Sequence, residues 1–109
     1  MNSRNKGGIA EKKAQNFLIN NGYRIVNTNF YCKGGEIDII AYKDNVIHFI
    51  EVKSGNNFEP IYNITPKKLQ RIIKCAYFYI KKNKINLAFC IDAIIIKNNS
   101  IEMIKNLTL

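Results

Sequence analysis

Residues 34–53, GGEIDIIAYKDNVIHFIEVK, decide the fold of this chain. They read as two mostly apolar strands joined by a two-residue turn at Asp44-Asn45. With that turn, Asp38 on the first strand lies directly opposite Glu51 on the second. Directly opposed residues have Cβ atoms about 4.5–5.5 Å apart, and like charges there are unfavourable. The pattern therefore favours a cation held between Asp38 and Glu51.

The residue types around this pair indicate the kind of cation. Two carboxylates and the backbone carbonyl of Val52 are oxygen ligands, which a hard cation such as Mg²⁺ or Mn²⁺ prefers. Lys53 adds a positive charge that can orient an attacking water or stabilise charge developing on a phosphate. Asp38, Glu51 and Lys53 on paired strands are thus what a metal-dependent phosphodiesterase needs.

The alternative interpretation of the hairpin is purely structural. In the same register Glu36 lies opposite Lys53, so these two residues can form a cross-strand salt bridge while Asp38 and Glu51 are solvated. The segments IDIIA and HFIEV are, however, apolar on both faces, which favours buried strands. A buried acid pair without a ligand is unfavourable, so the metal site is the preferred interpretation.

Four short segments carry a resemblance to a known family: GIAE at 8–11, GY at 22–23, GGEIDIIA at 34–41 and FIEVK at 49–53. On these segments the chain resembles the YraN family of small uncharacterised bacterial proteins, nearly from end to end. That family is similar to the restriction-endonuclease-like fold with its PD-(D/E)xK site, and within that fold to archaeal Holliday-junction resolvases.

The resemblance implies roles for individual residues. By position, Asp38 and Glu51 would be metal ligands, Lys53 the catalytic lysine, and Glu11 a helix-borne carboxylate that points at the metal. The chain departs from the family in two places: Ser54-Gly55 stands where an arginine is common, and Cys90-Ile91-Asp92 stands where Arg-Phe-Asp is common. These departures concern a phosphate contact, not the metal site.

The charge of the chain indicates a polyanionic partner. Its 109 residues fit one domain, 1–109, and carry a formal net charge of +9. Such an excess of positive charge favours a nucleic-acid partner, although a Lys- and Asn-rich composition is the alternative explanation for the charge. Neither a secretion signal nor a membrane span is expected, because no apolar leader and no run of about 18 apolar residues is present.

Basic residues gather where a helix is predicted to begin at Thr65-Pro66. Lys67, Lys68 and Arg71 fall in its first turns, where cations are unfavourable beside the helix dipole. A phosphate-facing role and an ordinary solvated face are both consistent with this placement. Close backbone approach to phosphate at Gly35, next to Glu36, is likewise an alternative to an ordinary tight turn.

The cysteines point to a reducing compartment. Cys32, Cys75 and Cys90 are an odd number at wide spacing, and the sequence has no CxxC or Cys/His ligand pattern. Neither a zinc site nor a disulfide framework is therefore expected. This usage predicts a cytoplasmic protein.

Periodicity and turn signals predict the element order α-β-β-β-α-β-β. The expected helices cover 9–21 and 66–82, and the strands 23–31, 36–41, 46–53, 87–96 and 100–105, with a loop at 54–64 beside the site. This order predicts an α/β fold, a three-layer sandwich with a mixed sheet flanked by helices. It agrees with the restriction-endonuclease-like fold that the resemblance implies.

The function predicted on these grounds is a Mg²⁺- or Mn²⁺-dependent nuclease acting on DNA, including branched or single-stranded forms. A non-catalytic nucleic-acid-binding module and a subunit that depends on a partner for activity are the alternatives. A homodimer is expected by analogy with fold relatives.

Overall fold

The computed structural model describes residues 3–55 and 64–108 and, for residues 3–7, the backbone alone. Its elements are α1 (Ser3–Asn20), β1 (Arg24–Cys32), β2 (Gly35–Lys43), β3 (Val46–Gly55), α2 (Pro66–Lys82), β4 (Ala88–Lys97) and β5 (Ser100–Ile104). The predicted element order is confirmed. Most of the predicted loop, residues 56–63, lies outside the described residues.

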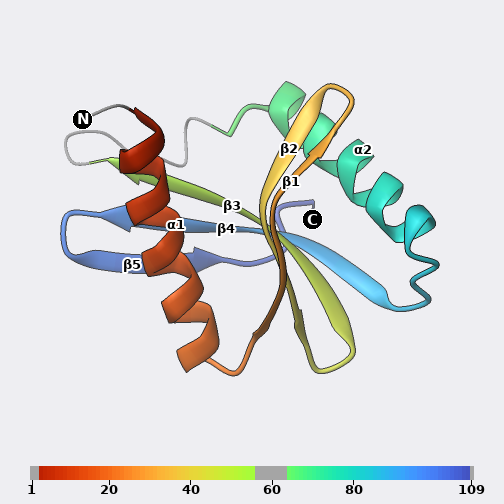
Figure 1. The fold of residues 1–109 in the computed structure, drawn as a ribbon, viewed down its shortest axis with the longest axis horizontal. Coiled ribbons are helices and arrows are strands. Elements are labelled where there is room, and N and C mark those ends of the chain that lie inside the picture. Colours follow the sequence, from red (N-terminus) through yellow and green to blue (C-terminus); the bar gives the residue numbers. More distant parts are fainter. Residues whose placement is uncertain (1–2, 56–63, 109) are drawn as a thin grey trace.

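The fold is an α/β sandwich in which α1 and α2 cover opposite faces of one five-stranded mixed sheet (Figure 1). The strands of the described residues lie in the order β1-β2-β3-β4-β5; β3 pairs with β4 in parallel, and the other neighbours are antiparallel. A parallel pair needs a long crossover, and α2 supplies it between β3 and β4. The predicted three-layer arrangement with a mixed sheet is therefore confirmed. Within the described residues, no helix is long and apolar enough to cross a membrane.

The central hairpin has the predicted turn. Asp44 and Asn45 have φ of 50° and 65°, the left-handed backbone of a two-residue hairpin turn. Lys43 pairs with Val46 as predicted. The pairing of β2 with β3 then continues only to Ile39 opposite Ile50.

Beyond Ile39, β2 leaves β3 and stays paired with β1. Glu36 is opposite Tyr31 on β1, so the predicted pairing of Glu36 with Lys53 is wrong. The reason lies in the packing: Ile37 belongs to the apolar cluster under α2, whereas Ile39 belongs to the cluster under α1. Residues two apart on a regular strand share a face, so β2 changes direction at Asp38. The tip of the β1–β2 hairpin consequently lies beside α2 (Figure 1).

Each face of the sheet has its own core. The α1 core consists of Ala10, Ala14, Leu18, Tyr23, Ile39, Ala41, Ile50, Ile94 and Ile96. The α2 core consists of Ile37, Ile40, Ile47, Phe49, Ile72, Cys75, Ala76, Tyr79 and Ile91. Phe49 lies at the centre of the α2 core, fully buried, with edge-on contacts to the rings of Tyr79 and Phe89. Burial of such side chains contributes about 1.5–3 kcal/mol each.

The ends of the helices follow local chemistry. Thr65 caps α2, its Oγ1 accepting from the backbone N–H of Lys68 at 3.1 Å, and Pro66 occupies the first position, as predicted. Helix α1 begins at Ser3 rather than near residue 9. Gly7 and Gly8 lie within this helix, because a glycine disfavours a helix by only about 1 kcal/mol, which does not by itself end one.

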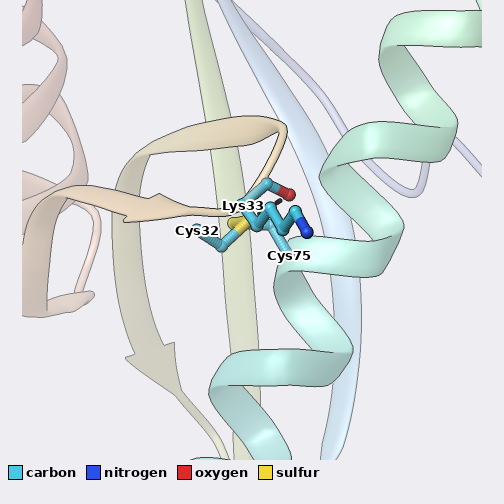
Figure 2. Close-up of a disulfide and its surroundings, with 3 residues drawn as sticks. All are labelled: Cys32, Lys33 and Cys75. Carbon is cyan, nitrogen blue, oxygen red and sulfur yellow. Dashed lines mark hydrogen bonds between the residues drawn. A yellow bond between two sulfur atoms is a disulfide. The ribbon is translucent and has the colours of Figure 1, made fainter.

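A disulfide joins Cys32 to Cys75, against the expectation drawn from the odd number and wide spacing of the cysteines (Figure 2). Cys32 ends β1 and Cys75 lies in the middle of α2, with their Cα atoms 5.7 Å apart. Sequence spacing could not show this proximity, because it depends on the hairpin bending towards α2. Disulfides are typical of oxidising compartments, so cysteine usage no longer supports a cytoplasmic location.

We predict that this disulfide is a major source of stability. It closes a sequence separation of 43 residues, for which the loss of chain entropy in the unfolded state corresponds to about 4 kcal/mol. The Cys32→Ser/Cys75→Ser double variant should unfold at a lower urea concentration, because its free energy of unfolding is reduced by that amount. A disulfide reductant should destabilise the wild type and leave the double variant unchanged; equal sensitivity of both proteins would contradict the assignment.

Candidate functional site

The two predicted metal ligands meet where β2 and β3 separate. Asp38 on β2 and Glu51 on β3 are both buried, with 8% and 5% of their surface exposed. The backbone N–H of Val52 donates to Asp38 Oδ2 at 2.8 Å. The Asp38 side chain thus bridges the two strands just beyond their last backbone pair. Direct opposition in the ladder was predicted, whereas the structure brings the two acids together across the diverging ends of the strands.

The surroundings of Asp38 disfavour its charged form. Burial, and then the negative charge of Glu51, raise the pKa of Asp38 to about 7, although the hydrogen bond from Val52 opposes the shift. Desolvation and a like charge both disfavour the ionised form. A divalent cation between the two acids would reverse both effects. This is the fit expected of an oxygen-ligand metal site.

Two lysines converge on Glu51. Lys68 Nζ lies 3.1 Å and Lys53 Nζ 3.6 Å from the same oxygen, Glu51 Oε1. Burial and the adjacent Lys68 lower the pKa of Lys53. Burial also opposes the charge on Lys68, but its contacts with Lys53 and Glu51 outweigh it and raise the pKa of Lys68. Both lysines therefore place positive charge against the buried Glu51.

Glu11 reaches the same region from α1. It is half-buried, and burial raises its pKa, opposed by Asn29 and reinforced by the charges of Glu36 and Glu51. In the amide orientation that satisfies its hydrogen bonds, Asn29 donates to both Glu11 oxygens at 3.1 Å. Sequence reasoning missed Asn29. Its φ of 51° fits the tolerance of asparagine for left-handed backbone, but that signal alone would not have linked it to Glu11.

A cleft of about 390 Å³ opens beside the acids, between the tip of the β1–β2 hairpin and the start of α2. It is lined by Gly34, Gly35, Glu36, Glu51, Thr65, Lys67, Lys68, Arg71 and Ile72. All five residues predicted for nucleic-acid contact are in this lining. Three of them are cations at the N-terminus of α2, the positive end of the helix dipole.

Two glycines let the tip of the β1–β2 hairpin pack closely against α2 at the wall of the cleft. Gly34 has φ of 88°, which side chains rarely adopt. Gly35 lies against α2, where an added Cβ would be 3.5 Å from the carbonyl oxygen of Arg71. The disulfide of Cys32 holds this tip against the helix (Figure 2). The lining of the cleft is thus fixed both covalently and by packing.

The fold and this site define a small α/β protein with a buried carboxylate–lysine centre beside a basic cleft. The chain belongs to the uncharacterised protein family UPF0102, whose model matches residues 10–96. The resemblance to the YraN family is therefore confirmed.

Relatives match along nearly the whole chain. A UPF0102 protein of Helicobacter hepaticus is 57% identical over 109 residues, which cover 100% of this chain and 99% of the relative. A UPF0102 protein of Wolinella succinogenes is 57% identical over 107 residues, 98% of this chain and 99% of its own. A Helicobacter pylori relative is 52% identical over 105 residues, 96% of this chain and 92% of its own.

We predict a pH-dependent stability that originates at Asp38. Folded Asp38 keeps its proton up to about pH 7, whereas the unfolded carboxyl releases it near its ordinary value of 3.8. The folded chain binds more protons in that window, so the free energy of unfolding falls as the pH rises through it, by on the order of 2–4 kcal/mol. Urea unfolding in chelator at pH 5 and pH 8 measures this difference.

The Asp38→Asn variant should lose most of that pH dependence, since its amide oxygen can still accept from Val52 but does not titrate. Asp44→Asn, in the exposed turn, is the matched control and should keep it. Mg²⁺ should restore stability to the wild type at pH 8 and have no effect on Asp38→Asn. An unchanged pH dependence in Asp38→Asn would show that Asp38 is not the titrating group.

Proposed function

We propose that this protein is a metal-dependent nuclease that cleaves DNA, including branched or single-stranded forms. The observation that carries the proposal is the buried pair Asp38 and Glu51, with Lys53 beside it, opening onto a cleft of cations. Burying two like charges in a sheet is costly, and a metal ion bound between them would offset that cost. The chemistry of the donor set fits Mg²⁺ or Mn²⁺, since all the candidate ligands are oxygens.

In this proposal Asp38 and Glu51, with the Val52 carbonyl, hold the metal, and Glu11 completes or shapes the site. The bound ion would supply an activated water and stabilise charge on the phosphate. Lys53, whose pKa is lowered by burial and by Lys68, is suited to orient that water or exchange a proton with it.

The cleft supports a nucleic-acid substrate. Lys67 and Arg71 are exposed on its wall and carry no described ion pair with an acid. The positive end of α2 faces the same space, and helix N-termini favour phosphate. With a net charge of +9, the chain would attract a polyanion from a distance. A DNA substrate would be met in the cytoplasm, so the proposal keeps a cytoplasmic location, while the Cys32–Cys75 disulfide is typical of oxidising compartments.

A second candidate is a nucleic-acid-binding module without turnover. The observation in its favour is the ion pair of Lys68 with Glu51 at 3.1 Å, which compensates one of the two acids without any metal. In that case the cleft binds phosphate and the acids serve to position Lys68. A subunit that becomes active only with a partner protein has the same site and would show cleavage only when the partner is added.

We predict that cleavage and metal binding disappear together. Asp38→Asn and Glu51→Gln should each lower Mg²⁺- or Mn²⁺-dependent cleavage by on the order of 10³-fold, because they remove a metal ligand with little change in volume. The assay uses labelled duplex, single-stranded and four-way-junction DNA, with calorimetric titration of the metal. Glu102→Gln, an exposed acid on β5, is the control and should retain activity. If the wild type binds DNA but binds no metal and cleaves none of the substrates, the nuclease proposal is wrong and the binding module without turnover remains.

We predict that Lys67 contacts phosphate in either case. Lys67→Ala should weaken DNA binding for all sequences and make the dependence of log K on log salt shallower by about 1, the counterion contribution of one contact. Lys81→Ala, at the far end of the same helix, should leave that dependence unchanged. Equal effects of the two variants would mean that only the net charge matters and that the cleft is not the binding surface.

A further inference from the structure

Three side chains with metal-ligating atoms gather on the α1 face of the sheet, apart from the acid pair. His48 on β3 is directly opposite Cys90 on β4, and Asp92 lies two residues further along β4 on the same face. The ligand atoms of the three residues all lie within 4.8 Å of one another. None of these residues has a part in the proposed nuclease chemistry.

The contacts among the three converge on a single atom. His48 Nδ1 lies 2.7 Å from Asp92 Oδ2 and 3.2 Å from Cys90 Sγ. One ring nitrogen carries either one proton or one lone pair, so it cannot form a full hydrogen bond with both neighbours at once. A cation at the point between the three atoms would instead be bound by all of them.

We propose that His48, Cys90 and Asp92 form a binding site for a divalent transition metal of the Zn²⁺ class. One nitrogen, one sulfur and one carboxylate oxygen are the three ligand types that Zn²⁺ takes in proteins. Three protein ligands leave a fourth position of a tetrahedral ion open to water or an external ligand. The softer sulfur and nitrogen ligands separate this site from the acid pair, whose oxygens suit Mg²⁺.

The spacing is close to that of a loaded site. Tetrahedral bonds of the usual Zn²⁺ lengths place neighbouring ligand atoms about 3.4–3.6 Å apart. His48 and Asp92 would therefore move apart by about 0.7 Å and His48 and Cys90 by about 0.4 Å. Small side-chain rotations supply shifts of this size without a change in the strands.

The surroundings hold the ligands in orientation. Asp92 is fully buried, and its second oxygen accepts from the backbone N–H of Asn106 at 2.8 Å. Such outer hydrogen bonds fix carboxylate ligands in metal sites. The ring of Tyr23 lies edge-on to His48 with the ring centroids 5.0 Å apart, covering it from one side. Cys90 is only half-buried, which leaves a route for an ion to enter.

His48 and Asp92 also make a close contact of their own, with 2.7 Å between His48 Nδ1 and Asp92 Oδ2. The alternative is that this pair serves only to fasten the segment after β5 through Asn106, and the experiment below separates the two.

The test is uptake of Zn²⁺ and Co²⁺ by the full chain with its Cys32–Cys75 disulfide intact, so that Cys90 is the one available thiol. Zn²⁺ is titrated against a coloured chelator, and Co²⁺ is followed by its sulfur-to-metal charge-transfer absorption. We expect one ion per chain, a charge-transfer band, and a higher melting temperature with Zn²⁺. A wild type that shows no stoichiometric uptake and no band overturns the proposal, whatever the variants do.

Variants locate the ion. Cys90→Ser should abolish the charge-transfer band and lower the affinity for Zn²⁺ by at least about tenfold. That is the loss that follows removal of even an outer hydrogen-bond partner in such sites. Asp38→Asn, which alters only the acid pair, should retain the band and the affinity for Zn²⁺. Equal Zn²⁺ affinity in Cys90→Ser and the wild type, or loss of binding in Asp38→Asn, would overturn the site. None of these measurements depends on cleavage of DNA.

Discussion

The structure depends on one constraint: β2 must leave β3 at Asp38 while remaining paired with β1. If the two strands had stayed paired, Asp38 and Glu51 would be opposed within a regular ladder, and the hairpin tip would continue in the plane of the sheet. Instead the Asp38 side chain takes the backbone N–H of Val52 as its partner at 2.8 Å. The divergence therefore creates the buried acid pair, and it also sends the tip of the β1–β2 hairpin towards α2.

Because α2 packs beside the diverging strands, a cleft forms between the start of the helix and the hairpin tip. Its apolar side packs on Phe49 and Ile40, and its capped N-terminus brings Lys68 to Glu51. The disulfide then joins the helix to the end of β1. One helix thus contributes a core, a set of cations and a covalent link. A change in its packing would therefore affect stability and the site together.

Strand β3 connects the two candidate metal sites. Alternation along this strand directs Phe49 to the α2 core and Ile50 to the α1 core. His48 lies beside Tyr23 and Asp92 on the α1 face, while Glu51 reaches Lys68 of α2. His48 and Glu51 are three residues apart on this strand, so their side chains point to opposite faces of the sheet. The ligands of the two sites differ in softness as well, which would allow each to select its own ion.

The sequence by itself determined the element order, the mixed sheet, the turn at Asp44-Asn45 and the cap at Thr65. These features follow from local chemistry: apolar periodicity, left-handed backbone at Asn and Asp, and the N-cap hydrogen bond. It also pointed to five of the nine residues that line the cleft, because charge at a helix start and glycine before a strand are visible in a single segment.

Only the tertiary structure decided the contacts between distant segments. The end of the β2–β3 ladder depends on which core accepts Ile37, and that choice is made by α2, far along the chain. The same packing brings Cys32 to Cys75, and the parallel register of β3 with β4 brings His48 to Cys90 and Asp92. Asp92 Oδ2 thereby comes within 2.7 Å of His48 Nδ1. No spacing rule anticipates such proximities, since they arise from how two strands and a crossover helix meet in space.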